Sequence, residues 1–211
     1  MDPHNHWNQV YGTRSPEQLS WHQARPELAL ELIAAAGVAK SAGIIDVGAG
    51  SSRLVDCLLE LGYNDLTVLD LSSAALDVSR ARLGARAATV RWCEADVTCF
   101  DPPRRYALWH DRALFHFLTD AGDRARYVAT LRKALTPSGA AIIATFATDG
   151  PSRCSGLDVM RHDERSIGLE LGPEFTLREI RRETHLTPWQ SEQRFIYCRF
   201  QRQAGIEDRS A

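Results

Sequence analysis

Two glycines stand directly after a short apolar run, where a strand is expected to end and a helix to begin. Gly48 and Gly50 follow residues 44–47 in the segment Ile-Ile-Asp-Val-Gly-Ala-Gly-Ser-Ser. Glycine permits a tight turn and a close approach of the backbone to a ligand, and the N–H groups at a helix N-terminus bind polar or negatively charged groups. The segment therefore predicts a binding site for a ligand that carries such a group.

Acidic residues accompany this loop at the ends of the first two expected strands. Asp46 precedes the glycines, and Asp70 ends the second apolar run, where a carboxylate accepts hydrogen bonds from both hydroxyls of a ribose. A nicotinamide dinucleotide would use the same acid. Its fingerprint G-x-G-x-x-G, however, requires glycine where this chain has Arg53. The pattern therefore disfavours a dinucleotide.

With Asp96 after the third expected strand, these residues resemble the cofactor site of class I S-adenosylmethionine (SAM)-dependent methyltransferases, over nearly the whole chain. Ser52 stands where that family often has a third glycine. In the family, the three acids lie near the methionine amine, the ribose and the adenine amine of SAM. The resemblance implies SAM as cofactor and S-adenosylhomocysteine (SAH) as product. The cofactor-binding residues that it implies are Trp21, Asp46, Gly48, Gly50, Asp70, Leu71, Asp96, Val97 and His110.

The acceptor of the methyl group is expected beyond the carboxyl ends of the fourth and fifth strands. Residues 109–114, Trp-His-Asp-Arg-Ala-Leu, resemble the corresponding part of thiopurine methyltransferases, which implies a small acceptor such as a thiol or a heteroaromatic nitrogen. Trp7, Tyr11 and Trp21, with the glycine loop, are similar to elongation-factor lysine methyltransferases, which modify protein. We favour the small acceptor. A protein-lysine N-methyltransferase and a non-catalytic SAM-binding regulatory protein are the alternatives.

Methyl transfer from a sulfonium is a direct displacement, so catalysis can rest largely on alignment of the reacting groups. Where the acceptor must lose a proton, a neutral histidine is a suitable base. His110 and Asp111 are the candidate catalytic residues, although packing at a strand end is the alternative role for His110. Arg161 is a candidate to hold an acidic group on the acceptor through its planar fork of donors. The expected substrate-binding residues are Trp109, Arg112, Phe115, His116, Cys154 and Arg161.

The elements that position these residues follow from β-branched runs that alternate with amphipathic stretches. Strands are expected at residues 44–47, 66–69, 88–92, 106–110 and 140–146, and helices at residues 27–36, 54–61, 72–83, 123–135 and 176–183. A hairpin of residues 185–189 and 195–200 is expected to close the sheet. We predict an α/β Rossmann-like fold: a seven-stranded sheet, mostly parallel, with a C-terminal antiparallel hairpin and helices on both faces.

We expect one domain over residues 1–211, with an N-terminal lid and helix in residues 1–40 and an acceptor-side loop in residues 147–173. The formal net charge is −2 and no dense basic run occurs, which argues against nucleic acid as a partner. No apolar window approaches the roughly 20 residues of a membrane span, and the start lacks a signal-peptide pattern, so a cytoplasmic protein is expected. Scattered histidines and five widely spaced cysteines predict no metal site.

Overall fold

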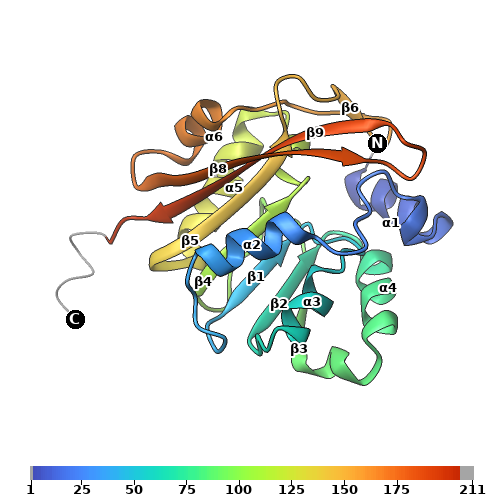
Figure 1. Cartoon of the computed structure of the whole chain (residues 1–211), viewed down its shortest axis with the longest axis horizontal. Helices are drawn as coiled ribbons and strands as arrows, with labels where there is room; N and C mark the ends of the chain where they lie inside the picture. The colour runs from blue at the N-terminus through green and yellow to red at the C-terminus, as the bar shows by residue number, and fades with distance from the viewer. Residues whose placement is uncertain (1, 205–211) are drawn as a thin grey trace.

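The computed structural model describes residues 2–204 (Figure 1). Its strands are β1 (Ile44–Val47), β2 (Leu66–Asp70), β3 (Val90–Glu94), β4 (Tyr106–Arg112), β5 (Leu135–Phe146), β6 (Arg153–Cys154), β7 (Leu157–Asp158), β8 (Phe175–Leu186) and β9 (Glu192–Arg202). Seven of them form one sheet in the order β3-β2-β1-β4-β5-β9-β8. The pairs among β1 to β5 are parallel, whereas β9 runs antiparallel to both β5 and β8. The predicted sheet and its C-terminal hairpin are confirmed.

Helices cover both faces of this sheet (Figure 1). The helices of the described residues are α1 (Pro3–Thr13), α2 (Glu27–Ala35), α3 (Leu54–Glu60), α4 (Ser73–Leu83), α5 (Ala121–Ala134) and α6 (Glu164–Leu171), and α2 to α6 are the ones that cover the sheet. Apolar side chains of α2, α3 and α4 pack in one hydrophobic cluster with one face of the sheet, and those of α5 and α6 pack in a second cluster with the other. Each described helix is too short or too polar to span a lipid bilayer.

Successive residues of the central strands point to opposite faces of the sheet, so each strand contributes side chains to both clusters. Ile44 of β1 belongs to the first cluster and Ile45 to the second, because successive strand residues point to opposite faces. A strand of a parallel sheet buried on both sides reads as a near-continuous apolar run, as β1 and residues 140–146 of β5 do. Side-chain caps then fix helix starts: Ser72 accepts a hydrogen bond from the backbone N–H of Ala75 at the start of α4.

The predicted helix at residues 176–183 is wrong, because this segment lies in β8. Its Arg and Glu side chains favour helix formation, but pairing with β9 overrides that preference. An ion pair of 3.0 Å between Glu179 and Arg199 connects the two strands. The first hairpin strand, expected at residues 185–189, therefore ends at Leu186, and the following residues form the turn.

Two further segments differ in detail from the expectation. The region 147–173, expected as a long loop or partly helical insertion, contains the β6–β7 hairpin and α6. The first residues of the chain were expected only as part of a lid, and they form α1, which packs beside α4. Asp2 caps α1 by accepting a hydrogen bond from the backbone N–H of His4.

Candidate functional site

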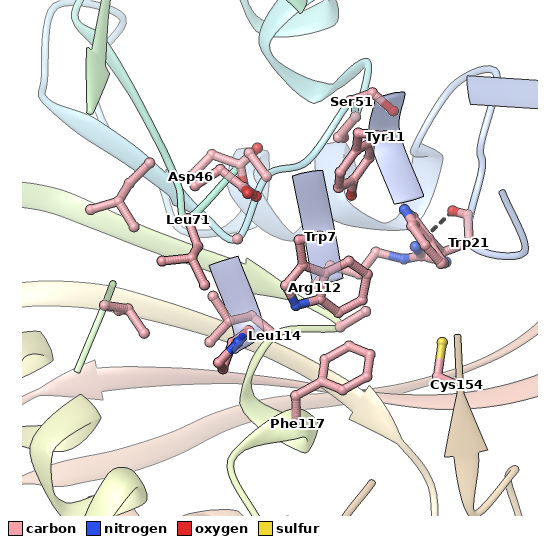
Figure 2. Close-up of a pocket in the computed structure, with 18 of the residues that line it drawn as sticks. Trp7, Tyr11, Trp21, Asp46, Ser51, Leu71, Arg112, Leu114, Phe117 and Cys154 are labelled. Atoms are coloured by element: carbon pink, nitrogen blue, oxygen red, sulfur yellow. Dashed lines mark hydrogen bonds between the residues drawn. The ribbon is translucent and has the colours of Figure 1, made fainter. Parts of the chain in front are cut away.

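A cavity of about 280 Å³ lies at the carboxyl ends of the parallel strands, beneath α1 (Figure 2). Its walls come from α1 and the following segment, the glycine loop after β1, the ends of β2, β3 and β4, and the β6–β7 hairpin. This position is the one expected for ligands of open α/β sheets. Of the predicted cofactor residues, the cavity is lined by Trp21, Asp46, Gly48, Asp70, Leu71, Asp96, Val97 and His110.

The glycine loop is closely packed, and the backbone requires glycine at both positions. Gly48 and Gly50 have φ values of 58° and 55°, which L-residues with a side chain rarely adopt. A Cβ atom on Gly48 would collide with the side chain of Leu114, and one on Gly50 with the hydroxyl of Tyr11. The loop therefore lies against both α1 and the segment after β4.

Asp70 joins this loop to the end of β2. Its buried carboxylate accepts hydrogen bonds from the backbone N–H of Gly50 at 2.7 Å and of Ser72 at 2.8 Å. Burial raises the pKa of Asp70 to about 6, although these two hydrogen bonds act in the opposite direction. Each oxygen of a carboxylate has a second acceptor position, so Asp70 can bind ligand hydroxyls while it holds the loop.

Asp46 and His110 form a buried pair on adjacent strands. They are directly opposite each other in the β1–β4 register, and Nδ1 of His110 lies 2.7 Å from a carboxylate oxygen of Asp46. Nε2 of His110 is buried and has no hydrogen-bond partner within residues 2–204. A neutral His110 that donates from Nδ1 to Asp46 has an unprotonated Nε2, able to accept a proton or a hydrogen bond.

The third acid, Asp96, lies in the turn after β3. Its carboxylate accepts hydrogen bonds from the backbone N–H of Thr98 at 2.8 Å and from the Thr98 hydroxyl at 2.7 Å. Leu71 and Val97 add apolar surface on either side of the acids. Three carboxylates, Asp46, Asp70 and Asp96, thus line one half of the cavity.

Aromatic side chains form the other half of the cavity wall (Figure 2). The ring of Trp7 meets that of Phe117 edge to face at 5.0 Å and that of Trp21 at 5.9 Å, and Tyr11 lies 6.2 Å from Trp21. Aromatic faces attract cations and exclude water. Phe117, Leu157, His22 and Gln23 complete this side; no sequence motif singled them out.

Arg112 and Cys154 are the predicted substrate-binding residues that line the cavity. The Arg112 side chain is 10% exposed and donates hydrogen bonds to the Tyr197 hydroxyl at 2.8 Å and the Trp21 carbonyl at 3.0 Å. Burial raises the pKa of the Cys154 thiol to about 11, so that the thiol is neutral near pH 7.

Two further predicted residues, which lie within β4, point away from the cavity. Trp109 and Asp111 point to the α5 side of the sheet, where Tyr127 accepts a hydrogen bond from Trp109 at 2.9 Å and donates one to Asp111 at 2.7 Å. Asp111 also accepts hydrogen bonds from the backbone N–H groups of Leu114 and Phe115. Asp111, expected to be catalytic, is therefore placed to anchor the turn after β4.

Three expected acceptor contacts also lie elsewhere. Phe115 packs in the core with its ring 4.9 Å from that of Tyr127. His116 is buried against Phe146, whose backbone N–H donates to its Nδ1 at 3.2 Å. Arg161 is exposed and donates to the Gly150 carbonyl at 3.3 Å. None of these three residues lines the cavity, and the contacts of each are with other parts of the protein.

Comparison with known proteins agrees with this architecture. Residues 44–139 match the family model of the methyltransferase domain. The N-methyltransferase NodS from Bradyrhizobium japonicum WM9, solved with SAH, superimposes with a TM-score of 0.70 at 14% identity, over 93% of this chain and 98% of that one. The 1,6-didemethyltoxoflavin-N1-methyltransferase of Burkholderia thailandensis, bound to 1,6-didemethyltoxoflavin and SAH, gives 0.66 at 20% identity, over 92% and 81%.

A further solved structure, described for the conversion of a disulfide bond into a thioacetal group during echinomycin biosynthesis, gives a TM-score of 0.76 at 19% identity. The superposition covers 94% of this chain and 91% of the other chain. No curated protein sequence matches the chain. At these identities the solved structures support the shared fold, and the domain match supports methyl transfer.

Proposed function

We propose that this class I SAM-dependent methyltransferase transfers the methyl group of SAM to a small nucleophilic acceptor, a thiol or a heteroaromatic nitrogen. The observation that carries the proposal is the form of the cavity. Its acidic half continues into an aromatic half that is lined by Trp7, Tyr11, Trp21 and Phe117. An aromatic wall of this kind suits a compact, flat acceptor. The toxoflavin-type neighbour, whose ligand is a small heterocycle, supports the same class.

The donor set of the acidic half fits SAM as cofactor and SAH as product. We assign Asp70 to the ribose hydroxyls, Asp96 to the adenine amine and Asp46 to the methionine amine, and the position of all three in the cavity wall supports this assignment. When bound, SAM supplies an electrophilic methyl group on a positively charged sulfur. The faces of Trp7 and Trp21 are suited to that positive charge and keep water away from it.

The contribution of the chain to the reaction is chiefly alignment. An acceptor held against the aromatic wall is brought into line with the methyl carbon, which converts a bimolecular encounter into an intramolecular step. His110 is the residue proposed to take a proton from an acceptor that arrives protonated. Asp46 orients its ring and stabilises the imidazolium that forms, through the 2.7 Å contact at Nδ1.

Incubation with methyl-labelled SAM tests the proposal. The protein is offered first a panel of thiols, amines and heterocycles, and then a protein extract. Label in a small product supports the proposal. Label in protein alone would favour a protein-lysine N-methyltransferase, and SAH binding without any labelled product would favour a regulatory SAM-binding protein.

A further inference from the structure

Arg82, in the last turn of α4, contacts the glycine loop from outside the cavity. Its guanidinium donates hydrogen bonds to the backbone carbonyls of Ser51 at 2.9 Å and of Ser52 at 2.6 Å. Both serines line the cavity, whereas Arg82 is not among the described residues of the cavity wall. Any effect of Arg82 on a bound ligand must therefore pass through the loop.

Asp56 holds the guanidinium of Arg82 in place. Its carboxylate accepts hydrogen bonds from Nε at 3.0 Å and from Nη2 at 2.8 Å, and the Asp56 side chain is only 4% exposed. A buried carboxylate needs such a partner, and the planar fork of an arginine gives the pair a fixed geometry. Because Asp56 lies in the first turn of α3, the ion pair joins the helix that follows the loop to the end of α4.

The peptide unit between Ser51 and Ser52 is held on both sides. Its carbonyl accepts from Arg82, and its N–H donates to the Ala49 carbonyl at 3.0 Å, which closes the turn of the loop. Since a peptide unit is planar, a fixed carbonyl also fixes the direction of the N–H. Asp70 holds the same loop from β2. Arg82 thus supplies a second anchor, from α4.

We propose that Arg82 is a positioning residue for the cofactor, which keeps the glycine loop in the conformation that binds the amino-acid part of SAM. The inference rests on the proposed function, in which SAM is the methyl donor. The N–H groups of such a loop suit a negatively charged group, and the carboxylate of SAM belongs to its amino-acid part. The ribose and the adenine are assigned to Asp70 and Asp96, which have no contact with Arg82 among the described hydrogen bonds and ion pairs.

Calorimetric titration with two ligands tests this role. SAH carries the amino-acid part, and 5′-methylthioadenosine lacks it. Without Arg82, only a fraction of the molecules holds the loop in the binding conformation, and the apparent affinity falls by that fraction. For a fraction of about one tenth, SAH affinity in Arg82→Met falls about tenfold, whereas the affinity for 5′-methylthioadenosine should change less than about threefold. A general loss of stability would leave the ratio of the two affinities unchanged.

Arg104→Met is the matched control. Arg104 forms a bidentate pair with Asp65, with two contacts of 2.6 Å, and neither residue is among the described residues of the cavity wall. This variant should lower stability without changing the affinity ratio. Arg82→Lys keeps a positive charge beside Asp56 but not the planar fork of donors. It should still lower the ratio, and it gives a readout where Arg82→Met fails to fold.

An unchanged ratio of SAH to 5′-methylthioadenosine affinity in folded Arg82→Met or Arg82→Lys would overturn this inference alone. The same change of ratio in Arg104→Met would also overturn it. A parent protein that binds neither ligand would overturn the proposed function together with the inference. The class of acceptor is tested separately, by the labelling experiment.

Discussion

Asp70, the residue proposed to bind the ribose, also holds the glycine loop in the structure. Its position at the end of β2 indicates ribose binding, yet its carboxylate already holds the backbone of Gly50 and Ser72. These hydrogen bonds fix the conformation of the loop, and the burial of the same carboxylate raises the pKa of Asp70. Cofactor affinity is consequently expected to depend on pH.

Ribose hydroxyls donate hydrogen bonds to the ionised carboxylate, so binding favours the charged form. With the pKa of Asp70 at about 6 before binding, SAH affinity should rise as pH rises through 6 and level off above 7. The increase between pH 5 and pH 7 is about tenfold for one such group. Calorimetric titrations of SAH into the protein between pH 5 and pH 7 test this increase in affinity. Asp70→Asn, which cannot ionise, should lack the rise; an identical pH profile in that variant would contradict the assignment.

His110→Ala is expected to separate catalysis from cofactor binding. SAH affinity should remain close to that of the parent, while turnover falls about 10²- to 10⁴-fold for an acceptor that must lose a proton. An acceptor already ionised at the assay pH should be affected much less, which makes it the internal control. Equal kcat for parent and variant with a protonated acceptor would assign His110 to packing against Asp46.

We expect Asp111 to stabilise the fold rather than to take part in the reaction. Removal of its carboxylate in Asp111→Ala leaves the Tyr127 hydroxyl and two backbone N–H groups without their acceptor. The free energy of unfolding should fall by about 1–3 kcal/mol, measured by denaturant titration. Tyr127→Phe removes only one of these donors and should lower the free energy of unfolding by less. Loss of turnover in Asp111→Ala without any loss of stability would show a catalytic role after all.

At the scale of elements, the two-residue period of β4 explains which predicted site residues line the cavity. His110 and Arg112 alternate with Trp109 and Asp111, so the two pairs point to opposite faces of the sheet. This alternation can be read from the sequence. It was missed because residues 109–112 were assigned to the site together, as one motif. The strand β8 could not be predicted in the same way. It is an edge strand rich in charged side chains, and pairing with β9 across the hairpin overrides the local preference of those side chains for a helix.

Contacts of the glycine loop with α1 lead to a prediction about two glycines. Gly50 and Gly62 both have positive φ, 55° and 84°, but only Gly50 is close to another element, at the Tyr11 hydroxyl. Both Gly→Ala changes carry backbone strain of about 1 kcal/mol. Gly50→Ala should in addition displace Tyr11 and lower SAH affinity at least about tenfold. Thermal unfolding and calorimetry test the pair; unchanged SAH affinity in Gly50→Ala would contradict the described packing of α1.

For the whole molecule, the order of apolar runs and helices was sufficient to predict the sheet, its hairpin and the end of the sheet at which the cavity lies. These follow from local periodicity and from the right-handed connections of parallel strands. The aromatic half of the cavity was predicted only in part, through the resemblance that singled out Trp7, Tyr11 and Trp21. It depends on the docking of α1 over the strand ends, where Asn8 accepts a hydrogen bond from the Ser72 hydroxyl at 2.7 Å, and such a long-range contact has no local signature.

Titration of SAH into the protein and into Asp70→Ala tests the central claim most directly. The acids at the three strand ends predict saturable binding of one SAH per chain, weakened about 10- to 100-fold in a folded Asp70→Ala variant through the loss of a charge-assisted interaction. Circular dichroism of the variant serves as the control for folding. Absence of SAH binding, unchanged affinity in Asp70→Ala, or tight binding of NADH by the parent protein would contradict the account.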